Sequence, residues 1–190
     1  MTHRLVYVVG PSGAGKDSVL HGLRRNWGDA DPAHWARRTI TRPADAGGEL
    51  HEAVDAQGFG QLCRMGAFAM HWNANGLSYG VRQSELLPIR DGRWVFVNGS
   101  RAWVPQLRQQ WPQATVVYIG ASPAVLAQRL AARGRESAQA VAERLARQVP
   151  AALPPETIQI ENDSTLADAV SALHEALVRC DRAGGVPSSN

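Results

Sequence analysis

The chain has 190 residues, of which 44% are hydrophobic and 19% are charged, a composition that excludes an intrinsically disordered protein. The formal net charge is +3, from nineteen arginines and one lysine among the basic residues, and these are scattered rather than clustered with aromatic residues as on nucleic-acid-binding surfaces. The first apolar stretch, Leu5 to Val9, is too short to span a membrane, and the two cysteines lack the spacing of a zinc site. We therefore expect a cytoplasmic globular protein that has neither nucleic acid nor a membrane as a partner.

Short apolar runs alternate along the chain with amphipathic helical stretches, a pattern typical of a parallel sheet flanked by helices. In chain order the sequence predicts strand Leu5–Val9, helix Gly15–Asn26, strand Trp94–Val97, helix Ala102–Gln110, strand Thr115–Ile119, helix Pro123–Ala132, strand Thr157–Ile160 and helix Thr165–Cys180. We expect Asp163 or Ser164 to cap the last helix. The sequence therefore predicts an α/β fold.

Two polar segments interrupt this alternation. The first, about 35–92, is rich in Gly, Asn, His and Arg and is predicted to be an irregular substrate-binding insertion. The second, about 132–138, includes the sequence ARGRES and is predicted to be a small hinged lid. We expect a single domain over 1–182, with its core in 1–34 and 93–182, followed by a Gly/Pro/Ser-rich, disordered tail, 183–190.

Residues 10–18 read GPSGAGKDS, a G-x-x-x-x-G-K loop between a predicted strand and a predicted helix. A glycine-rich turn can direct several backbone N–H groups at a triphosphate, and the helix that follows adds its positive end. Lys16, the only lysine of the chain, can reach the β- and γ-phosphates as a compact charge. We therefore predict that Lys16 is catalytic and that ATP is bound by Gly10, Pro11, Ser12, Gly13, Ala14, Gly15, Lys16, Asp17 and Ser18.

The loop departs from the usual P-loop pattern directly after its lysine. Asp17 stands where a magnesium-binding Ser or Thr normally follows, and the strand that ends at Asn98 is followed by Gly99 and Ser100, where many P-loop enzymes have an aspartate. Our hypothesis is that Asp17 binds Mg²⁺ directly or through water, and that Asn98 or Ser100 orients a water or the acceptor. The alternative, that Asp17 only caps or solvates the helix start, stays open.

The order of short motifs over most of the chain resembles that of guanylate kinase. The motifs are GPSGAGK, TITRP at 39–43, GGE at 47–49, YG at 79–80, RLAARGRES at 129–137, AERL at 142–145 and ND at 162–163. The stretches RRTITRPADAGGELHEA, FAMHWNANGLSYGV, NGSR and RGRES more specifically resemble the ribose 1,5-bisphosphate phosphokinase family of phosphonate degradation. This resemblance implies a P-loop nucleoside-monophosphate-kinase-like three-layer α/β/α fold. It also implies phosphorylation of ribose 1,5-bisphosphate by ATP, with Mg²⁺, to 5-phospho-α-D-ribose 1-diphosphate (PRPP) and ADP.

The chain departs from guanylate kinase at three places in a way that favours a substrate without a base. Counting back from Tyr79, the guanine-reading glutamate of that family falls on Met70, whose thioether cannot accept two hydrogen bonds from a base. The Asp-Tyr pair of the family is replaced by His51 and Glu52, and the second phosphate-binding arginine after the TRP stretch is missing, with Ala44 and Asp45 in its place. A pocket without these groups suits a sugar that carries two phosphates.

The resemblance also implies which residues form the site. Arg42, in the TITRP stretch, is predicted to be catalytic, as is Arg133 of the lid, which would neutralise charge in the transition state. Arg129 and Arg133 are predicted to contact ATP, although Arg129 could instead be a surface charge. The predicted substrate-binding residues are Arg37, Arg38, Arg42, Glu52, His71, Tyr79, Asn98 and Ser100.

The acceptor phosphate is already anionic at neutral pH, so the mechanism needs no side-chain base. Three other functions stay open at this point: guanylate kinase or another nucleoside monophosphate kinase, a P-loop kinase for another small molecule such as a sugar acid, and a non-catalytic guanylate-kinase-like interaction module. The intact Gly10, Gly15 and Lys16 argue against the interaction module.

Overall fold

The computed structural model describes residues 4–27, 32–44, 50–132 and 153–184. Its elements in chain order are β1 (Leu5–Val9), α1 (Lys16–Asn26), β2 (Ala33–Trp35), β3 (Arg38–Ile40), β4 (Glu52–Ala53), α2 (Ala56–Arg64), β5 (Phe68–Ala74), β6 (Leu77–Arg82), α3 (Gln83–Leu86), η2 (Leu87–Asp91), β7 (Trp94–Asn98), η3 (Arg101–Trp103), α4 (Val104–Gln110), β8 (Thr115–Gly120), α5 (Pro123–Ala132), β9 (Ile158–Glu161) and α7 (Leu166–Gly184).

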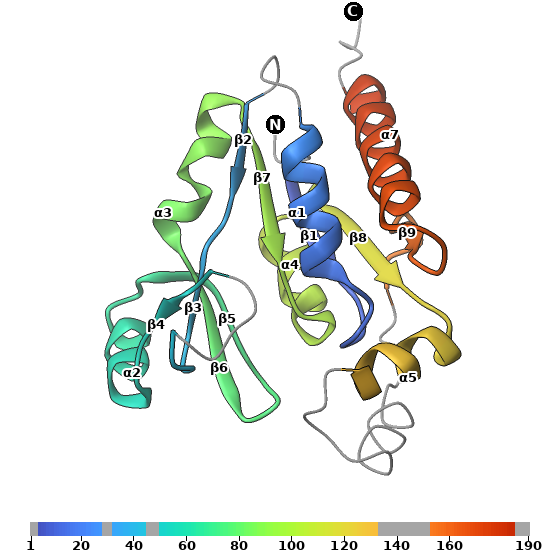
Figure 1. Ribbon diagram of the computed structural model, residues 1–190. Helices are drawn as coiled ribbons and strands as arrows, with labels where there is room; N and C mark the ends of the chain where they lie inside the picture. The colour runs from blue at the N-terminus through green and yellow to red at the C-terminus, as the bar shows by residue number, and fades with distance from the viewer. Residues whose placement is uncertain (1–3, 28–31, 45–49, 133–152, 185–190) are drawn as a thin grey trace, which may run out of the picture. The chain divides into compact units, whose positions relative to one another are not determined.

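The strands form two sheets (Figure 1). The larger has five strands in the order β2-β7-β1-β8-β9, and its outer pairs, β2 with β7 and β8 with β9, are parallel. All five residues of β1 and of β7 are buried, as expected for inner strands of a parallel sheet, which read as continuous apolar runs. The predicted α/β class is therefore confirmed.

The strand and helix boundaries follow the predictions closely where hydrophobic periodicity is strong. The bounds of β1 and α5 are those predicted, and β7 and β8 each extend one residue beyond their predicted ends. The sequence missed β2, because its three half-buried residues provide no apolar run. The last helix continues to Gly184, four residues past its predicted end.

The segment predicted to be an irregular substrate-binding insertion is not irregular, which corrects that part of the prediction from sequence. It contains a four-stranded sheet in the order β4-β3-β6-β5. The side chains of β5 alternate between buried and more exposed positions. Its polar residues lie mainly at the exposed positions of a strand, so they are not a sign of irregular structure. A two-residue turn joins β5 to β6, with positive φ at Asn75 (51°) and Gly76 (74°), the pattern that a type I′ turn requires.

The described residues form two compact units. The first contains the elements from β2 to α4, and the second contains α1, α5, β9, α7 and β8 from Val116, while β1 contributes residues to both. In the second unit, α1 and α7 lie side by side (Figure 1). Gly22 permits this approach, because a Cβ atom there would lie 2.7 Å from Cγ2 of Val170.

The cap of α7 differs from the one predicted. Thr165, rather than Asp163 or Ser164, accepts a hydrogen bond from the backbone N–H of Asp168 (3.2 Å), and the Asp168 carboxylate accepts one from the N–H of Thr165 (3.3 Å). This reciprocal pair is a capping box. The hydroxyls of Thr165 and Ser164 hold the pKa of Asp168 below its usual value. Asp163 instead accepts a hydrogen bond from the backbone of Ser122 (2.7 Å).

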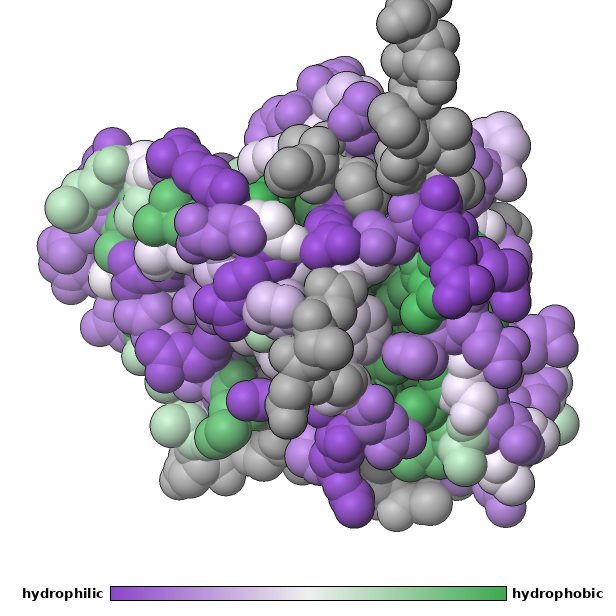
Figure 2. All heavy atoms as spheres, turned by 90° about the horizontal axis from the view of Figure 1, so that it is seen from above, coloured by the Kyte–Doolittle hydropathy of each residue, from purple (hydrophilic) through white to green (hydrophobic). Residues whose placement is uncertain are grey.

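Hydrophilic side chains cover most of the face seen from above in Figure 2, with smaller apolar areas between them. Among the helices of the described ranges, none is long and apolar enough to cross a membrane.

Candidate active site

The loop between β1 and α1, which is the predicted ATP-binding loop, turns at three glycines with positive φ angles. Gly10, Gly13 and Gly15 have φ angles of 155°, 90° and 83°, values that side chains strongly disfavour. A Cβ atom at Gly10 would lie 2.0 Å from the carbonyl oxygen of Ile119. The glycine positions of the predicted loop are therefore required by the geometry, and the loop leads directly into the first turn of α1, the end of a helix that favours anions.

Two side chains contact this loop, one from the residue that follows β9 and one from α5. The Nδ2 atom of Asn162, which directly follows β9, donates to the carbonyl oxygen of Ala14 (2.8 Å). The guanidinium of Arg129 on α5 donates to the same oxygen (3.5 Å) and to the carbonyl oxygen of Asn162 (2.8 Å). Sequence reasoning gave Asn162 no role, although the ND motif at 162–163 was the available signal.

Lys16 is held within the loop. Its Nζ atom donates to the carbonyl oxygens of Gly10 (2.9 Å) and Pro11 (3.0 Å). These contacts keep the ammonium group against the cradle, where it can exchange a carbonyl oxygen for a phosphate oxygen. The position fits the predicted catalytic role.

Asp17 and Ser18 are exposed in the first turn of α1, next to Lys16. In the part of the chain that the structure describes, no cluster of three or more His, Cys, Asp or Glu side chains could enclose a metal ion. Mg²⁺ in nucleotide sites is commonly held by one or two protein oxygens together with phosphates and water. The exposed carboxylate of Asp17 and hydroxyl of Ser18 fit that donor set.

The turn after β7 has a fixed backbone. The hydroxyl of Tyr7 accepts from the backbone N–H of Ser100 (2.9 Å) and donates to the Ser100 carbonyl oxygen (3.3 Å). A Cβ atom at Gly99 would lie 2.0 Å from the Tyr7 ring, so only glycine fits there. Burial raises the pKa of Tyr7 far above its usual value, which keeps this hydroxyl protonated. Asn98, at the end of β7, is buried, and the side chain of Ser100 follows this turn.

Arg42 forms a reciprocal pair with His51. Its Nη2 atom donates to Nδ1 of His51 (3.3 Å), and Nε2 of His51 donates to the Arg42 carbonyl oxygen (3.1 Å). The Nε atom of Arg42 is buried and has no hydrogen-bond partner among the described residues. A buried N–H donor of this kind is costly unless a ligand accepts from it, which favours the predicted phosphate contact.

Arg38 lies over an aromatic pair on the four-stranded sheet. Its guanidinium is 5.1 Å from the centre of the Tyr79 ring, a cation–π distance. Tyr79 stacks on Trp72, with ring centres 5.8 Å apart and planes 3° apart. Met70, the predicted counterpart of the base-reading glutamate of guanylate kinase, is fully buried on β5. A fully buried thioether at this position agrees with the predicted absence of a base-reading group.

Glu52 is occupied by protein partners. Its two carboxylate oxygens accept from Nη2 (2.6 Å) and Nε (3.0 Å) of Arg82, and one also accepts from the hydroxyl of Thr39 (2.6 Å). The Arg82 guanidinium holds the pKa of Glu52 below its usual range. This arrangement is that of a brace between β3, β4 and β6, so contact of Glu52 with a sugar hydroxyl stays a prediction.

The other predicted residues are less closely grouped. His71 is exposed on β5 and lines a cavity of about 1060 Å³ between β5, α3 and α4 within the first unit. Arg37 is exposed just before β3. The lid arginine Arg133 and most of the predicted lid lie outside the described residues.

Comparison with known proteins agrees with this geometry. The family model described as guanylate kinase matches residues 2–179. A solved guanylate kinase from Anaplasma phagocytophilum superposes with a TM-score of 0.62 at 18% identity, covering 97% of this chain and 87% of that one. The chain thus belongs to the guanylate kinase family of P-loop proteins.

Curated relatives place the chain in a narrower group within this family. The ribose 1,5-bisphosphate phosphokinase PhnN of Pseudomonas paraeruginosa is 43% identical over 91% of this chain and 94% of its own length. The bifunctional ribose 1,5-bisphosphokinase-thymidine phosphorylase of Azorhizobium caulinodans is 47% identical over 90% of this chain. The chain therefore belongs with the ribose 1,5-bisphosphate phosphokinases. It spans between 25% and 40% of the length of four such relatives, including the bifunctional protein.

Proposed function

We propose that this protein transfers the γ-phosphoryl group of ATP to the 1-phosphate of ribose 1,5-bisphosphate and releases PRPP and ADP. One observation carries the proposal: an intact P-loop occurs in a chain whose base-reading position is a fully buried methionine, Met70, while Arg38 and Arg42 are kept. The names of the relatives support the same substrate. Guanylate kinase activity is disfavoured, because the thioether of Met70 cannot accept two hydrogen bonds from guanine as a carboxylate would.

The reaction is a displacement at phosphorus. An oxygen of the acceptor's 1-phosphate attacks the γ-phosphorus, a new P–O bond forms, and the bond from that phosphorus to the β–γ bridging oxygen breaks as its electrons leave with ADP. The acceptor oxygen is already anionic, so no proton has to be removed. Catalysis then depends on positioning the two substrates and on neutralising the charge of their phosphates. Lys16 binds phosphate oxygens of the donor, and Arg42 orients the acceptor.

The remaining site roles belong to the same proposal. Asp17 and Ser18 would hold Mg²⁺, which when bound shields the charge of the phosphate oxygens. Arg129 supports the loop that holds ATP, and Arg133 would act from a lid at about 132–138. We also propose one kinase domain over 1–182 with its substrate-binding insertion at about 35–92, acting in the cytoplasm.

Product analysis tests the proposal. Purified protein is incubated with ATP, Mg²⁺ and ribose 1,5-bisphosphate, and the phosphorus NMR spectrum is recorded. The proposal predicts loss of the anomeric phosphate signal and growth of two coupled diphosphate signals of PRPP, together with ADP. Lys16→Met is the matched control and should give no product. An unchanged anomeric phosphate signal, with enzyme that still binds ADP, would refute the proposal.

A further inference from the structure

Two chain segments connect the four-stranded sheet to strands β2 and β7. The first is short, since only Ala36 and Arg37 separate β2 from β3. The second runs from the end of β6 through α3 and η2 to β7. A side chain that ties these segments together therefore fixes where β3 begins, and with it the arginines at positions 37 and 38.

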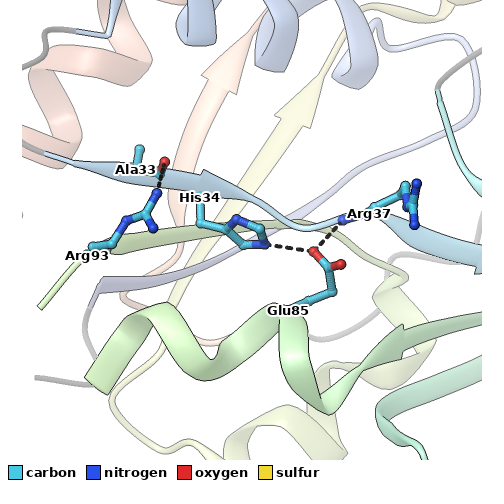
Figure 3. Close-up of polar contacts among 5 residues, drawn as sticks. All are labelled: Ala33, His34, Arg37, Glu85 and Arg93. Atoms are coloured by element: carbon cyan, nitrogen blue, oxygen red, sulfur yellow. Dashed lines mark hydrogen bonds and ion pairs between the residues drawn. The ribbon is translucent and has the colours of Figure 1, made fainter. Parts of the chain in front are cut away.

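Glu85, on α3, makes this tie with a single oxygen atom. Its Oε2 accepts from Nε2 of His34 on β2 (2.7 Å) and from the backbone N–H of Arg37 (2.9 Å), as Figure 3 shows. The Glu85 side chain is 18% exposed and that of His34 is 30% exposed. Hydrogen bonds to a carboxylate are stronger than those between neutral groups, and partial burial strengthens them further.

The His34 side of this tie is firmly anchored. The carbonyl oxygen of Ala33 accepts from Nη2 of Arg93 (3.0 Å), and the N–H of Ala36 donates to the carbonyl oxygen of Phe96 (2.9 Å). Trp35 stacks on the Phe96 ring, with ring centres 4.2 Å apart and planes 9° apart. Strand β2 is thus fixed on β7. Through its hydrogen bonds to His34 and to the Arg37 N–H, Glu85 links the backbone of Arg37 to this fixed strand.

The carboxylate holds the backbone of Arg37 and leaves its charged group alone. Figure 3 shows the Arg37 guanidinium directed away from Glu85, and the side chain is exposed. A guanidinium paired with Glu85 would be neutralised and unsuited to phosphate. Glu85 therefore positions Arg37 through its backbone and does not neutralise the charge of its guanidinium.

We infer that Glu85 is a positioning residue for the phosphorylated acceptor. By holding the backbone at Arg37, it sets where the guanidinium groups of Arg37 and Arg38 meet a phosphate of the acceptor. The inference rests on the proposed function, because it assumes that these arginines bind the acceptor. Glu85 acts through them and touches neither substrate.

The test compares KM values for the two substrates in four proteins. Glu85→Ala should raise KM for ribose 1,5-bisphosphate roughly tenfold while KM for ATP stays within about twofold. Glu85→Gln should restore most of the acceptor affinity, because its amide oxygen can still accept from the Arg37 N–H. Glu175→Ala is the control. Glu175 is exposed on α7, and its carboxylate lies 3.7 Å from the guanidinium of Arg179, which makes a weak surface ion pair.

The outcomes separate a positioning role from a merely structural one. A Glu85→Ala variant whose KM for the acceptor equals that of Glu175→Ala, or whose two KM values rise equally, would overturn the inference. If Glu85→Ala does not fold, His34→Phe provides a milder form of the same comparison. It removes the hydrogen bond that anchors Glu85 to β2 and keeps the hydrogen bond from the Arg37 N–H to Glu85. It should raise KM for the acceptor roughly threefold and leave that for ATP unchanged.

Failure of the proposed function would look different. Wild-type enzyme that ignores ribose 1,5-bisphosphate and phosphorylates another phosphate-bearing acceptor would refute the substrate assignment. The role of Glu85 would then be judged by KM for that acceptor in the same proteins. A selective rise in Glu85→Ala would support it, and no selective rise would overturn it.

Discussion

Replacing Asn162 tests whether the P-loop depends on the strand end beside it. Asn162→Ala removes the 2.8 Å hydrogen bond from Nδ2 to the Ala14 carbonyl oxygen and leaves that oxygen the longer 3.5 Å contact from Arg129. Because Asn162 is 3% exposed, water cannot readily replace the lost donor. A buried polar group deprived of its partner costs about 1–3 kcal/mol, so we expect the free energy of unfolding to fall by about 2 kcal/mol.

Nucleotide affinity should fall with it, since Ala14 lies within the loop that we predict to hold the phosphates. We expect ADP to bind roughly tenfold more weakly, the equivalent of about 1.4 kcal/mol. Urea unfolding followed by tryptophan fluorescence gives the stability, and calorimetric titration with ADP gives the affinity. Gln159→Ala, an exposed change on β9, is the control. If Asn162→Ala matches this control in both measurements, the loop does not depend on Asn162 and the reasoning is refuted.

A double-mutant cycle sharpens this prediction. In Gly15→Ala the new Cβ atom would lie 2.5 Å from Nδ2 of Asn162, and the positive φ at position 15 adds backbone strain. Combining it with Asn162→Ala removes the clash and keeps the strain. The double variant should therefore be more stable than the sum of the single effects predicts, and strict additivity would contradict the close contact.

Three further changes test other parts of the molecule. Gly10→Ala should abolish ADP binding in a calorimetric titration, because its Cβ atom would lie 2.0 Å from a carbonyl oxygen of β8, and retained binding would contradict the loop geometry. Tyr7→Phe should lower the unfolding free energy in urea by about 1–3 kcal/mol, because the Ser100 backbone loses its hydroxyl partner; a change near zero would contradict that role. The depressed pKa of Glu52 means that its ion pair with Arg82 stabilises the fold above the usual Glu pKa and is lost as pH falls. The stability deficit of Arg82→Gln should therefore shrink below about pH 4, and a pH-independent deficit would exclude the ion pair as its cause.

The sequence predicted the parts of the fold that depend on local pattern. The apolar run of β1, the periodicity of α5 and the glycine spacing of the P-loop are each readable without a partner, because burial on both faces, helical repeat and positive φ impose them directly. Strand β2 could not be read in this way, since its residues are half-buried and gain their pairing only from β7.

The candidate site shows the same division. Lys16 and its loop could be predicted as a site from spacing alone, whereas the proposed roles of Asn162 and Glu85 depend on contacts between residues distant in sequence. For Glu52 the motif position predicted contact with the substrate. In the structure its carboxylate pairs in bidentate fashion with Arg82, which lies 30 positions away in the sequence. Such partners follow from tertiary packing, which a single sequence does not display.

The central claim is that the acceptor site serves a phosphorylated sugar and rejects a nucleotide base. A coupled assay of ADP release with ATP and Mg²⁺ tests it directly, with ribose 1,5-bisphosphate, GMP, AMP and gluconate compared at equal concentration. We predict turnover with the bisphosphate alone. Turnover with GMP alone would contradict the account, because the buried Met70 could then not be what decides the acceptor.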